Sequence, residues 1–295
     1  MITKLDLYKV FCQVGKNKSF SKAAKELYMT QPAVSQSIMQ LERELDTRLF
    51  TRTPKGVILT NEGKILYEHA ISAINLIDAG EKKLLDSKNL MIGDLKIGVG
   101  DTTSKYFLLP YLEEFHSRYP NVKLKIINRT TLELCSLVKS GNIDIAICNL
   151  PIEDSSIEII ECMEVHDIFV CGEKFKNLTS SPLNFEDIVK LPLILLEPKS
   201  NSRRYVEKFI SSKGVQIGAE IELGSHDLLL EFAKINLGIA CVVKEFSSNY
   251  LENKILYEIK TVEQIPKRNI GFGFLKSVSL SPASKKFVEL LCKEK

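Results

Sequence analysis

Residues 20–63 read FSKAAKELYMTQPAVSQSIMQLERELDTRLFTRTPKGVILTNEG, and this stretch decides the fold of the N-terminal part of the chain. It predicts a short helix with Ser21 as its N-cap, followed after a tight turn by a second helix. Thr30 is the expected N-cap of the second helix, and Pro32 lies in its first turn, where a missing N–H costs no intrahelical hydrogen bond. Two short helices joined in this way are typical of a helix-turn-helix.

The second helix separates an apolar stripe from a polar face. The stripe is expected to pack on the first helix and consists of Val34, Ile38, Leu41 and Leu45. The groups expected to face outward, or to lie at the helix N-terminus, are Gln31, Pro32, Ser35, Gln36, Gln40 and Arg43. Glutamine pairs with adenine, and arginine with guanine or phosphate, so this face predicts DNA recognition. The alternative is an ordinary amphipathic helix whose polar face is only solvated.

A basic hairpin follows the two helices. Residues 51–56 and 57–59 predict two short strands, and the tip between them carries Arg52 and Lys55 as candidate phosphate contacts. Residues 1–65 contain eleven Lys and Arg against six Asp and Glu, whereas the whole chain has a net charge of only +3. Positive charge segregated in this way predicts double-stranded DNA as a partner. The alternative is an enzyme or small-molecule-binding protein whose N-terminal helices only dimerise it.

Residues 61–88 predict one long helix. Apolar and small residues recur there with spacings of four and three, at Leu66, Ala70, Ala73, Ile77, Gly80 and Leu84. A helix of this length spans about 40 Å at 1.5 Å per residue, and so apolar a helix requires a packing partner. A second subunit is the favoured partner, and packing against the chain's own C-terminal part is the alternative.

From Asp94 onward, short β-rich runs alternate with helical runs, which predicts an α/β fold with a largely parallel sheet. Two lobes are expected, lobe I from residues 89–162 and 268–295, and lobe II from residues 163–267. The expected strands are residues 95–99, 122–127, 143–147, 193–196, 220–223, 239–243 and 270–274. The expected helices are residues 100–118, 130–141, 203–213, 225–236 and 282–292, with Gly238 stopping the fourth.

The N-terminal motifs resemble those of the LysR-type transcriptional regulators of bacteria, and the resemblance extends over essentially all 295 residues. TQPAVSQSI, residues 30–38, lies where the recognition helix of that family lies. The resemblance implies a winged helix-turn-helix in residues 1–60, a dimerising linker helix, and a periplasmic-binding-protein-like effector domain of two Rossmann-like lobes in residues 89–295. It also implies a homotetramer. Many members have arginine where Gln36 stands, so an adenine contact is expected in place of a guanine contact.

A cleft between the lobes is the expected effector site, because helix N-termini at the carboxyl ends of strands suit anions. The hydroxyl and amide side chains expected there are Thr102, Thr103, Ser104, Thr131, Ser200, Asn201, Ser202 and Ser225. Arg129 or Arg203 could pair with a carboxylate, and His226 could hydrogen-bond an anion. A small organic or inorganic anion is therefore expected as the effector. Each hydroxyl also has a simpler interpretation as a plain helix N-cap.

Neither catalysis nor a cofactor is indicated. The sequence has no Gly-x-Ser-x-Gly elbow, Walker loop or dinucleotide fingerprint, so the protein is not expected to be an enzyme. Cys162, His166 and Cys171 lack a fourth ligand for zinc, and a redox role for the two cysteines is a minor alternative. A cytoplasmic protein is expected, because 44% of the residues are hydrophobic, no span of roughly 18 apolar residues occurs and no secretory signal is present. The seven cysteines include no CxxC motif and are expected to be reduced thiols.

Overall fold

The computed structural model describes residues 5–54, 56–86 and 93–292, and the chain divides into two compact units at residues 85 and 86. Each unit has its own hydrophobic core. Within the described residues, no helix is both long enough and apolar enough to cross a membrane.

The N-terminal unit is a small helical domain with a hairpin and a long helix. Its elements are α1 (Leu5–Asn17), α2 (Phe20–Glu26), α3 (Gln31–Glu44), β1 (Phe50–Thr53), β2 (Gly56–Leu59) and α4 (Asn61–Asp86). Helix α1 is not predicted from the sequence, yet it supplies Phe11 and Val14, both fully buried, to the core that α2 and α3 share. Ala23 and Ala24 are also buried there, which permits the close approach of α2.

Two local predictions in this unit are wrong. Ser19, not Ser21, caps α2, because the Ser19 hydroxyl accepts the backbone N–H of Lys22 (3.3 Å) while Ser21 already lies in the helix. Leu45 does not continue the apolar stripe of α3, since it is the C-cap residue and is 37% exposed. The predicted N-cap Thr30 is confirmed, with its hydroxyl accepting from Ala33 N (3.4 Å).

The hairpin is held against the helices by hydrogen bonds from its backbone N–H groups. One carboxylate oxygen of Glu42 in α3 accepts from the backbone N–H groups of Leu49 (2.7 Å) and Phe50 (3.2 Å). At the other end, Val57 N donates to the carbonyl of Lys18 (3.1 Å). A Cβ at Gly56, whose φ is +130°, would lie 2.5 Å from that same carbonyl oxygen, so only glycine allows this approach.

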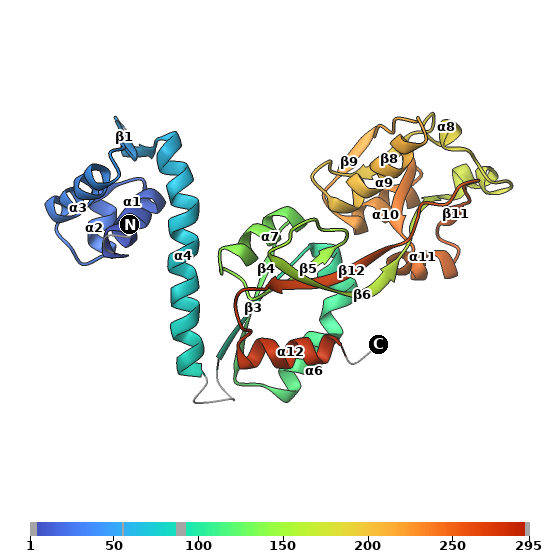
Figure 1. Cartoon of the computed structure of the whole chain (residues 1–295). Helices are drawn as coiled ribbons and strands as arrows, with labels where there is room; N and C mark the ends of the chain where they lie inside the picture. The colour runs from blue at the N-terminus through green and yellow to red at the C-terminus, as the bar shows by residue number, and fades with distance from the viewer. Residues whose placement is uncertain (1–4, 55, 87–92, 293–295) are drawn as a thin grey trace. The chain divides into compact units, whose positions relative to one another are not determined.

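The long helix α4 packs on the N-terminal core through its first half. Ala70 is buried, and Leu66, Tyr67, Ile71 and Ile74 pack against the same core (Figure 1). Part of the predicted apolar stripe is not used in this way, because Ile77 is 41% exposed and Ala73 is also exposed. The side chain of Leu84 and residues 87 and 88 of the predicted linker lie outside the described part of the chain.

The first lobe of the C-terminal unit is a five-stranded mixed sheet with helices on its faces. Its strands are β3 (Gly93–Val99), β4 (Val122–Asn128), β5 (Ile145–Asn149), β6 (Ile157–Val165) and β12 (Arg268–Leu275), in the order β4-β3-β5-β12-β6. Its helices are α5 (Asp101–Thr103), a π-helical turn (Ser104–Leu108), α6 (Leu109–Arg118), α7 (Thr131–Lys139) and α12 (Pro282–Leu291). Phe115 of α6 and Phe287 of α12 meet edge to face at 5.2 Å, and the two helices lie side by side in Figure 1.

The second lobe has the same plan. Its strands are β7 (Asp167–Cys171), β8 (Leu193–Leu196), β9 (Ile221–Leu223), β10 (Ile239–Val243) and β11 (Tyr257–Ile259), in the order β11-β7-β10-β8-β9. Its helices are α8 (Phe185–Ile188), α9 (Asn201–Ser212), α10 (His226–Lys234), α11 (Ser248–Glu252), and two 3-10 segments, Glu173–Thr179 and Glu245–Ser247.

Several details differ from the sequence prediction. Strands β6, β7 and β11 are not predicted, and because β12 pairs antiparallel with both β5 and β6, the first sheet is mixed and not largely parallel. Helix α9 begins at Asn201, two residues earlier than predicted, because Ser200 is its N-cap. Helix α10 is stopped not by Gly238 but by Asn236, which adopts a positive φ of 63°.

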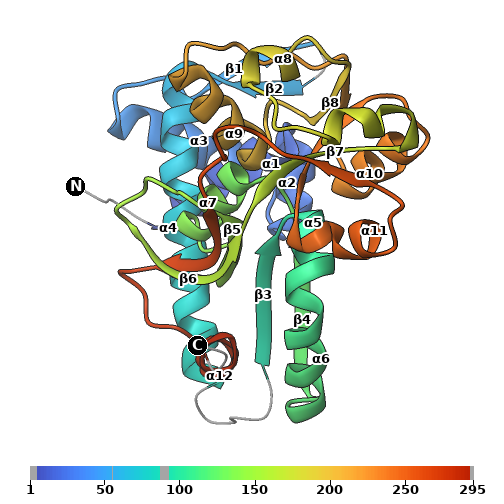
Figure 2. The same cartoon turned by 90° about the vertical axis from the view of Figure 1, so that its right-hand side faces the viewer.

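Two chain crossovers join the lobes, and they lie beside each other in Figure 1 and Figure 2. Strand β6 continues past residue 162, where lobe I was expected to end, since Val165 still pairs with Arg268 of β12. The Arg268 guanidinium forms a bidentate pair with Asp167, the first residue of β7 (2.5 and 2.9 Å). The side chains of this pair are only 1% and 4% exposed, so a buried ion pair fixes the point where the chain passes between lobes.

Candidate functional sites

The first candidate site is the outward face of α3. Gln31, Pro32, Gln36 and Arg43 are exposed, and Ser35 is half-buried. The apolar residues Val34, Ile38 and Leu41 on the opposite side are buried in the core, so the polar face is turned away from the domain. Gln40 is half-buried and donates to Glu44 within the same helix (2.9 Å).

Three further residues of α2, α3 and the turn between them are exposed. Ser21 is exposed at the start of α2. Tyr28, in the turn before α3, is 97% exposed and has a positive φ of 55°, and Met39 of α3 is 54% exposed. Tyr28 and Met39 are not predicted as exposed from the sequence, because large apolar residues are usually expected to be buried.

The predicted wing residues are placed only in part. Strand β1 pairs with β2 in antiparallel register, with Arg52 opposite Val57, which confirms the predicted hairpin. The side chain of Arg52 and the whole of Lys55 lie outside the described residues.

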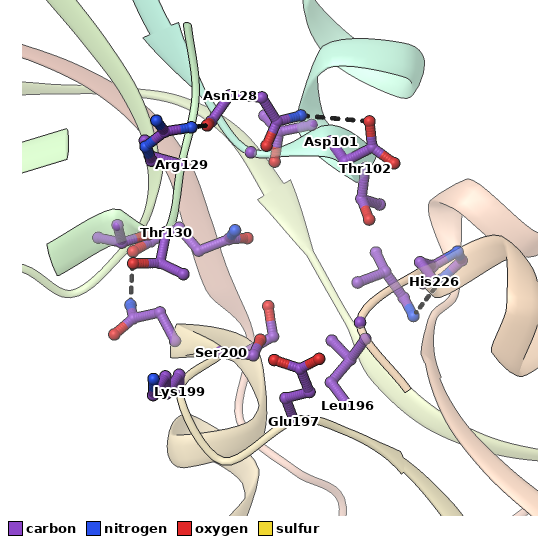
Figure 3. Close-up of a pocket in the computed structure, with 18 of the residues that line it drawn as sticks. Asp101, Thr102, Asn128, Arg129, Thr130, Leu196, Glu197, Lys199, Ser200 and His226 are labelled. Carbon is purple, nitrogen blue, oxygen red and sulfur yellow. Dashed lines mark hydrogen bonds between the residues drawn. The ribbon is translucent and has the colours of Figure 1, made fainter. Parts of the chain in front are cut away.

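The second candidate site is a cavity of about 350 Å³ between the two lobes (Figure 3). Eight of the predicted effector residues line it, namely Thr102, Thr103, Arg129, Thr131, Ser200, Asn201, Ser202 and His226. The polar residues there that the sequence analysis does not name as site residues are Asp101, Asn128, Thr130, Glu133, Asn149, Glu197 and Lys199. These residues also lie at the ends of strands or the starts of helices. The rule that ligands bind at the carboxyl ends of the strands in α/β sheets could therefore have identified them.

Three predicted effector residues do not line this cavity. Ser104 begins the π-helical turn, and Ser225 is the N-cap residue of α10. Arg203 is buried and is held within the second lobe, because it donates to Glu207 (2.5 Å) and to the carbonyl of Leu196 (2.8 Å). Its guanidinium therefore has a structural role and is not turned toward a ligand in the cavity.

The wall formed by the first lobe has one exposed cation. Arg129 donates to the carbonyl of Asn128 (2.7 Å), and the Asn128 amide donates to Asp101 (3.2 Å). Among the described carboxylates, none lies within ion-pairing distance of Arg129. Glu133 instead caps α7, accepting from the Thr130 hydroxyl (2.7 Å) and backbone N–H (3.0 Å), and these bonds lower the pKa of Glu133.

The wall formed by the second lobe brings a carboxylate toward the middle of the cavity. In Figure 3 the Glu197 carboxylate points inward, toward the side on which the Thr102 hydroxyl lies. Within the described part of the chain, the Glu197 side chain forms no ion pair, and Lys199 lies at the edge of the same loop. The cavity therefore presents hydroxyls, helix N-termini and charges of both signs.

His226 lines the cavity and also makes a structural hydrogen bond. Its Nε2 accepts from the backbone N–H of Val243 (3.0 Å), so the neutral ring carries its proton on Nδ1, which is buried without a partner among the described groups. Burial lowers the pKa of His226 to about 4. The ring is consequently neutral near pH 7 and cannot pair with an anion as an imidazolium.

The lobes are tied to each other on both sides of the cavity. The Asn201 amide in α9 donates to the carbonyl of Asn149 at the end of β5 (2.6 Å). Opposite, Asp227 of α10 accepts from Lys105 (2.8 Å) and from the Tyr106 hydroxyl (2.5 Å). Asn149 also accepts from Arg268 through its side chain (2.6 Å), so one of these ties continues directly into the crossover.

The cysteines do not support the site considered from sequence. Cys171 is fully buried on β7, and burial raises its pKa to about 11, while Cys162 lies on the separate strand β6. In the described residues, no group of three or more His, Cys, Asp and Glu side chains could hold a metal ion.

Two protein-family models match the chain. The model described as "Bacterial regulatory helix-turn-helix protein, lysR family" matches residues 5–64, and the model described as "LysR substrate binding domain" matches residues 88–294. Together they cover the α3 face, the hairpin and the interlobe cavity.

Curated proteins and solved structures agree with these matches. A probable RuBisCO transcriptional regulator of Emiliania huxleyi is 29% identical over 273 residues, which are 90% of this chain and 87% of that protein. The HTH-type transcriptional activator CmpR of Synechocystis is 25% identical, over 80% of this chain and 77% of CmpR. Full-length CbnR in complex with target DNA has a TM-score of 0.67 at 18% identity and covers 99% of this chain and 100% of CbnR. A full-length OxyR variant from Pseudomonas aeruginosa has a TM-score of 0.70 at 18% identity, covering 99% and 94%.

Proposed function

The chain belongs to the LysR family of bacterial helix-turn-helix regulators, and from this premise we propose that a small organic anion bound between its lobes controls how it binds promoter DNA. It is a DNA-binding transcriptional regulator with an effector-binding domain. The observation that carries the effector proposal is the polar cavity between two lobes that hydrogen bonds already tie together. A ligand there contacts both lobes at once. It can therefore shift the equilibrium between the open and the closed arrangement of the two lobes.

In the proposed DNA complex, α3 lies in the major groove. Gln31, Ser35 and Gln36 read base edges, Arg43 contacts a base or phosphate, and Arg52 and Lys55 of the hairpin hold phosphates. The exposure of the α3 face and the net positive charge of residues 1–65 support this assignment. Gln36 then favours adenine at its position in the half-site.

In the proposed effector complex, the anionic group lies near Arg129 and the N-terminus of α9, while a hydroxyl or amine of the ligand donates to Glu197. Helix N-termini offer unpaired N–H groups and a positive dipole end, which supports the anion. The Glu197 carboxylate at the cavity centre supports a donor group elsewhere on the same ligand. A purely anionic ligand without a donor would leave Glu197 facing negative charge.

The regulator is proposed to act in the cytoplasm as a homotetramer that pairs through α4. The exposed apolar residues Ile65 (63%) and Ile77 (41%) on α4 support pairing with a second copy. No enzymatic reaction is assigned to the cavity, because the family members that resemble the chain are named as regulators.

DNA recognition is tested by footprinting on the promoter region of the gene that encodes this protein. The measurement is made across a salt series and with random DNA as competitor. Protection of an interrupted palindrome is expected, with Gln36→Ala relaxing sequence preference and Arg52→Ala weakening all binding and its salt dependence. Binding no tighter than to random DNA would instead favour the alternative of an enzyme or small-molecule-binding protein that is merely dimerised by its N-terminal helices.

A panel of small hydroxy and amino carboxylates, screened by thermal shift on the full chain, tests the effector proposal. Thr102→Ala should reduce affinity for any hit about tenfold or more, as expected for one lost hydrogen bond to a charged group. Ser104→Ala is the matched control, because Ser104 lies two residues away but outside the cavity wall. Equal affinity in both variants would remove Thr102 from the site.

A further inference from the structure

One large apolar side chain lies on the outward face of α3. Met39 is 54% exposed, and within the described part of the chain it does not belong to the hydrophobic core of the N-terminal unit. It is part of a row of residues spaced by four, three and four positions, which consists of Pro32, Gln36, Met39 and Arg43. At about 100° per residue, the centre of this row is about 180° from the centre of the buried stripe formed by Val34, Ile38 and Leu41. Met39 therefore lies among the candidate DNA contacts and faces away from the protein.

The polar neighbours of Met39 do not cover its side chain. Gln36 and Arg43, about one turn to either side, are exposed. The Gln40 amide donates to Glu44 of the same helix (2.9 Å) and is directed along the helix toward its C-terminus. The contact that α3 offers to a partner at position 39 is therefore an apolar one.

The groups in the major groove decide what an apolar contact can recognise. Hydrogen-bond donors and acceptors line the base edges there, and thymine is distinguished by an apolar group, its C5-methyl. A methionine side chain is unbranched, flexible and polarisable, so it can adapt its shape to a small apolar partner. Contact between the two groups removes apolar surface of both from water, which favours binding.

We propose that Met39 contacts the C5-methyl of a thymine in each operator half-site and so determines the preferred base pair at that position. The inference rests on the proposed function, in which α3 lies in the major groove. It adds an apolar contact to the hydrogen bonds proposed for Gln31, Ser35 and Gln36. Base preference along α3 then comes from two kinds of interaction, hydrogen bonds near the start of the helix and methyl packing about one turn beyond Gln36.

The test measures binding of the full chain to the operator fragment that the footprint identifies, with each thymine of both half-sites replaced in turn by deoxyuridine. This replacement removes the C5-methyl and keeps every hydrogen-bonding group of the base pair. The wild type should lose affinity about fourfold per half-site at one thymine, as expected when one methyl-sized apolar group is returned to water. Met39→Gln should bind the unmodified fragment more weakly and should show no further loss when that thymine is replaced.

Two control variants separate this contact from a change in fold or in the surrounding surface. Met39→Leu keeps an apolar side chain and should keep the loss of affinity on deoxyuridine. Met29→Ala removes the same type of side chain from the turn before α3, where it is 37% exposed, and should also keep that loss. Methionine, leucine and glutamine have similar helix propensities, so both Met39 variants should melt at the temperature of the wild type.

The inference is overturned by any of three results. One is a wild-type chain that protects its operator but binds equally well after deoxyuridine replaces any thymine. Another is a Met39→Gln variant that keeps every deoxyuridine effect of the wild type. The third is a Met29→Ala variant that abolishes the effect while Met39→Gln does not. A chain without any specific footprint would contradict the proposed function and this inference with it, so the two failures are distinguishable.

Discussion

The buried ion pair between Arg268 and Asp167 predicts a large and specific loss of stability. Its side chains are 1% and 4% exposed, and Arg268 also donates to Asn149 (2.6 Å). Arg268→Met leaves the Asp167 carboxylate buried without its counter-ion, which costs about 3–5 kcal/mol. The transition of the C-terminal unit should therefore move down by roughly 6–20 °C, at about 2–4 °C per kcal/mol for a domain of this size.

The neighbouring residue supplies the control. Lys267 pairs with Glu164 at 2.6 Å, but the side chains are 56% and 53% exposed. Such surface pairs contribute about 0–1 kcal/mol, so Lys267→Met should shift the transition by no more than about 4 °C. The two substitutions remove neighbouring positive charges at the start of β12. They differ mainly in how deeply the substituted side chain is buried.

Differential scanning calorimetry of the full chain is the appropriate assay. The larger transition belongs to residues 86–295, because unfolding enthalpy scales with the number of residues. The double variant Asp167→Val/Arg268→Met should recover part of the loss, since it removes the uncompensated charge. Two results would contradict this expectation. One is that Arg268→Met lowers the melting temperature no more than Lys267→Met does, and the other is that the double variant loses as much as Arg268→Met and the single variant Asp167→Val together.

Three further predictions concern the hairpin, His226 and the ties between the lobes. Glu42→Ala should cost about 1–3 kcal/mol by leaving the backbone N–H groups of Leu49 and Phe50 without their acceptor, and it should weaken operator binding in gel-shift titrations. Glu42→Gln, which keeps one acceptor oxygen, should be milder, and equal losses in both variants would contradict this account. His226 has a folded pKa of about 4, below its ordinary value of 6.5, so the unfolded chain binds the extra proton and the stabilisation present above pH 6.5 is lost as the pH falls toward 4. His226→Gln should flatten the decline in melting temperature between pH 7 and pH 5, and an unchanged slope would show that other groups cause it. Asp227→Asn weakens the tie to Lys105 and Tyr106, so it should lower the melting temperature of the C-terminal unit by a few degrees at most, because these side chains are partly exposed. The same substitution at Asp187, whose pair with Lys190 lies within one segment, is the control, and an effect larger there would argue against a role for the tie between lobes.

Local sequence signals determine much of the N-terminal unit. Thr30 and Pro32 specify the start of α3, and the spacing of Val34, Ile38 and Leu41 specifies its buried side, because capping and helical periodicity act over a few residues. The prediction fails at two helix ends. Ser19 is the N-cap of α2 because the helix already begins at Phe20, and Leu45 is the C-cap residue of α3 and is exposed.

The sequence also identifies the strand-to-helix turns that surround the cavity, since strands and helices alternate along the chain. It cannot identify which polar side chains at those turns remain available, because that depends on partners far away in sequence. Arg203 is engaged by Glu207 and the Leu196 carbonyl, and only Nε2 of His226 is engaged, by Val243, whereas Glu197 points into the cavity.

Pairings between distant segments are decided only by the tertiary structure. Arg268 and Asp167 are 101 residues apart, and Asn201 donates to the carbonyl of Asn149, which lies 52 residues earlier in the chain. Sequence periodicity reports which side of an element is buried, but not which buried groups face each other. The start of α3 and its exposed polar face therefore follow from the sequence, while the ion pair at the crossover and the ties across the cavity follow from the fold.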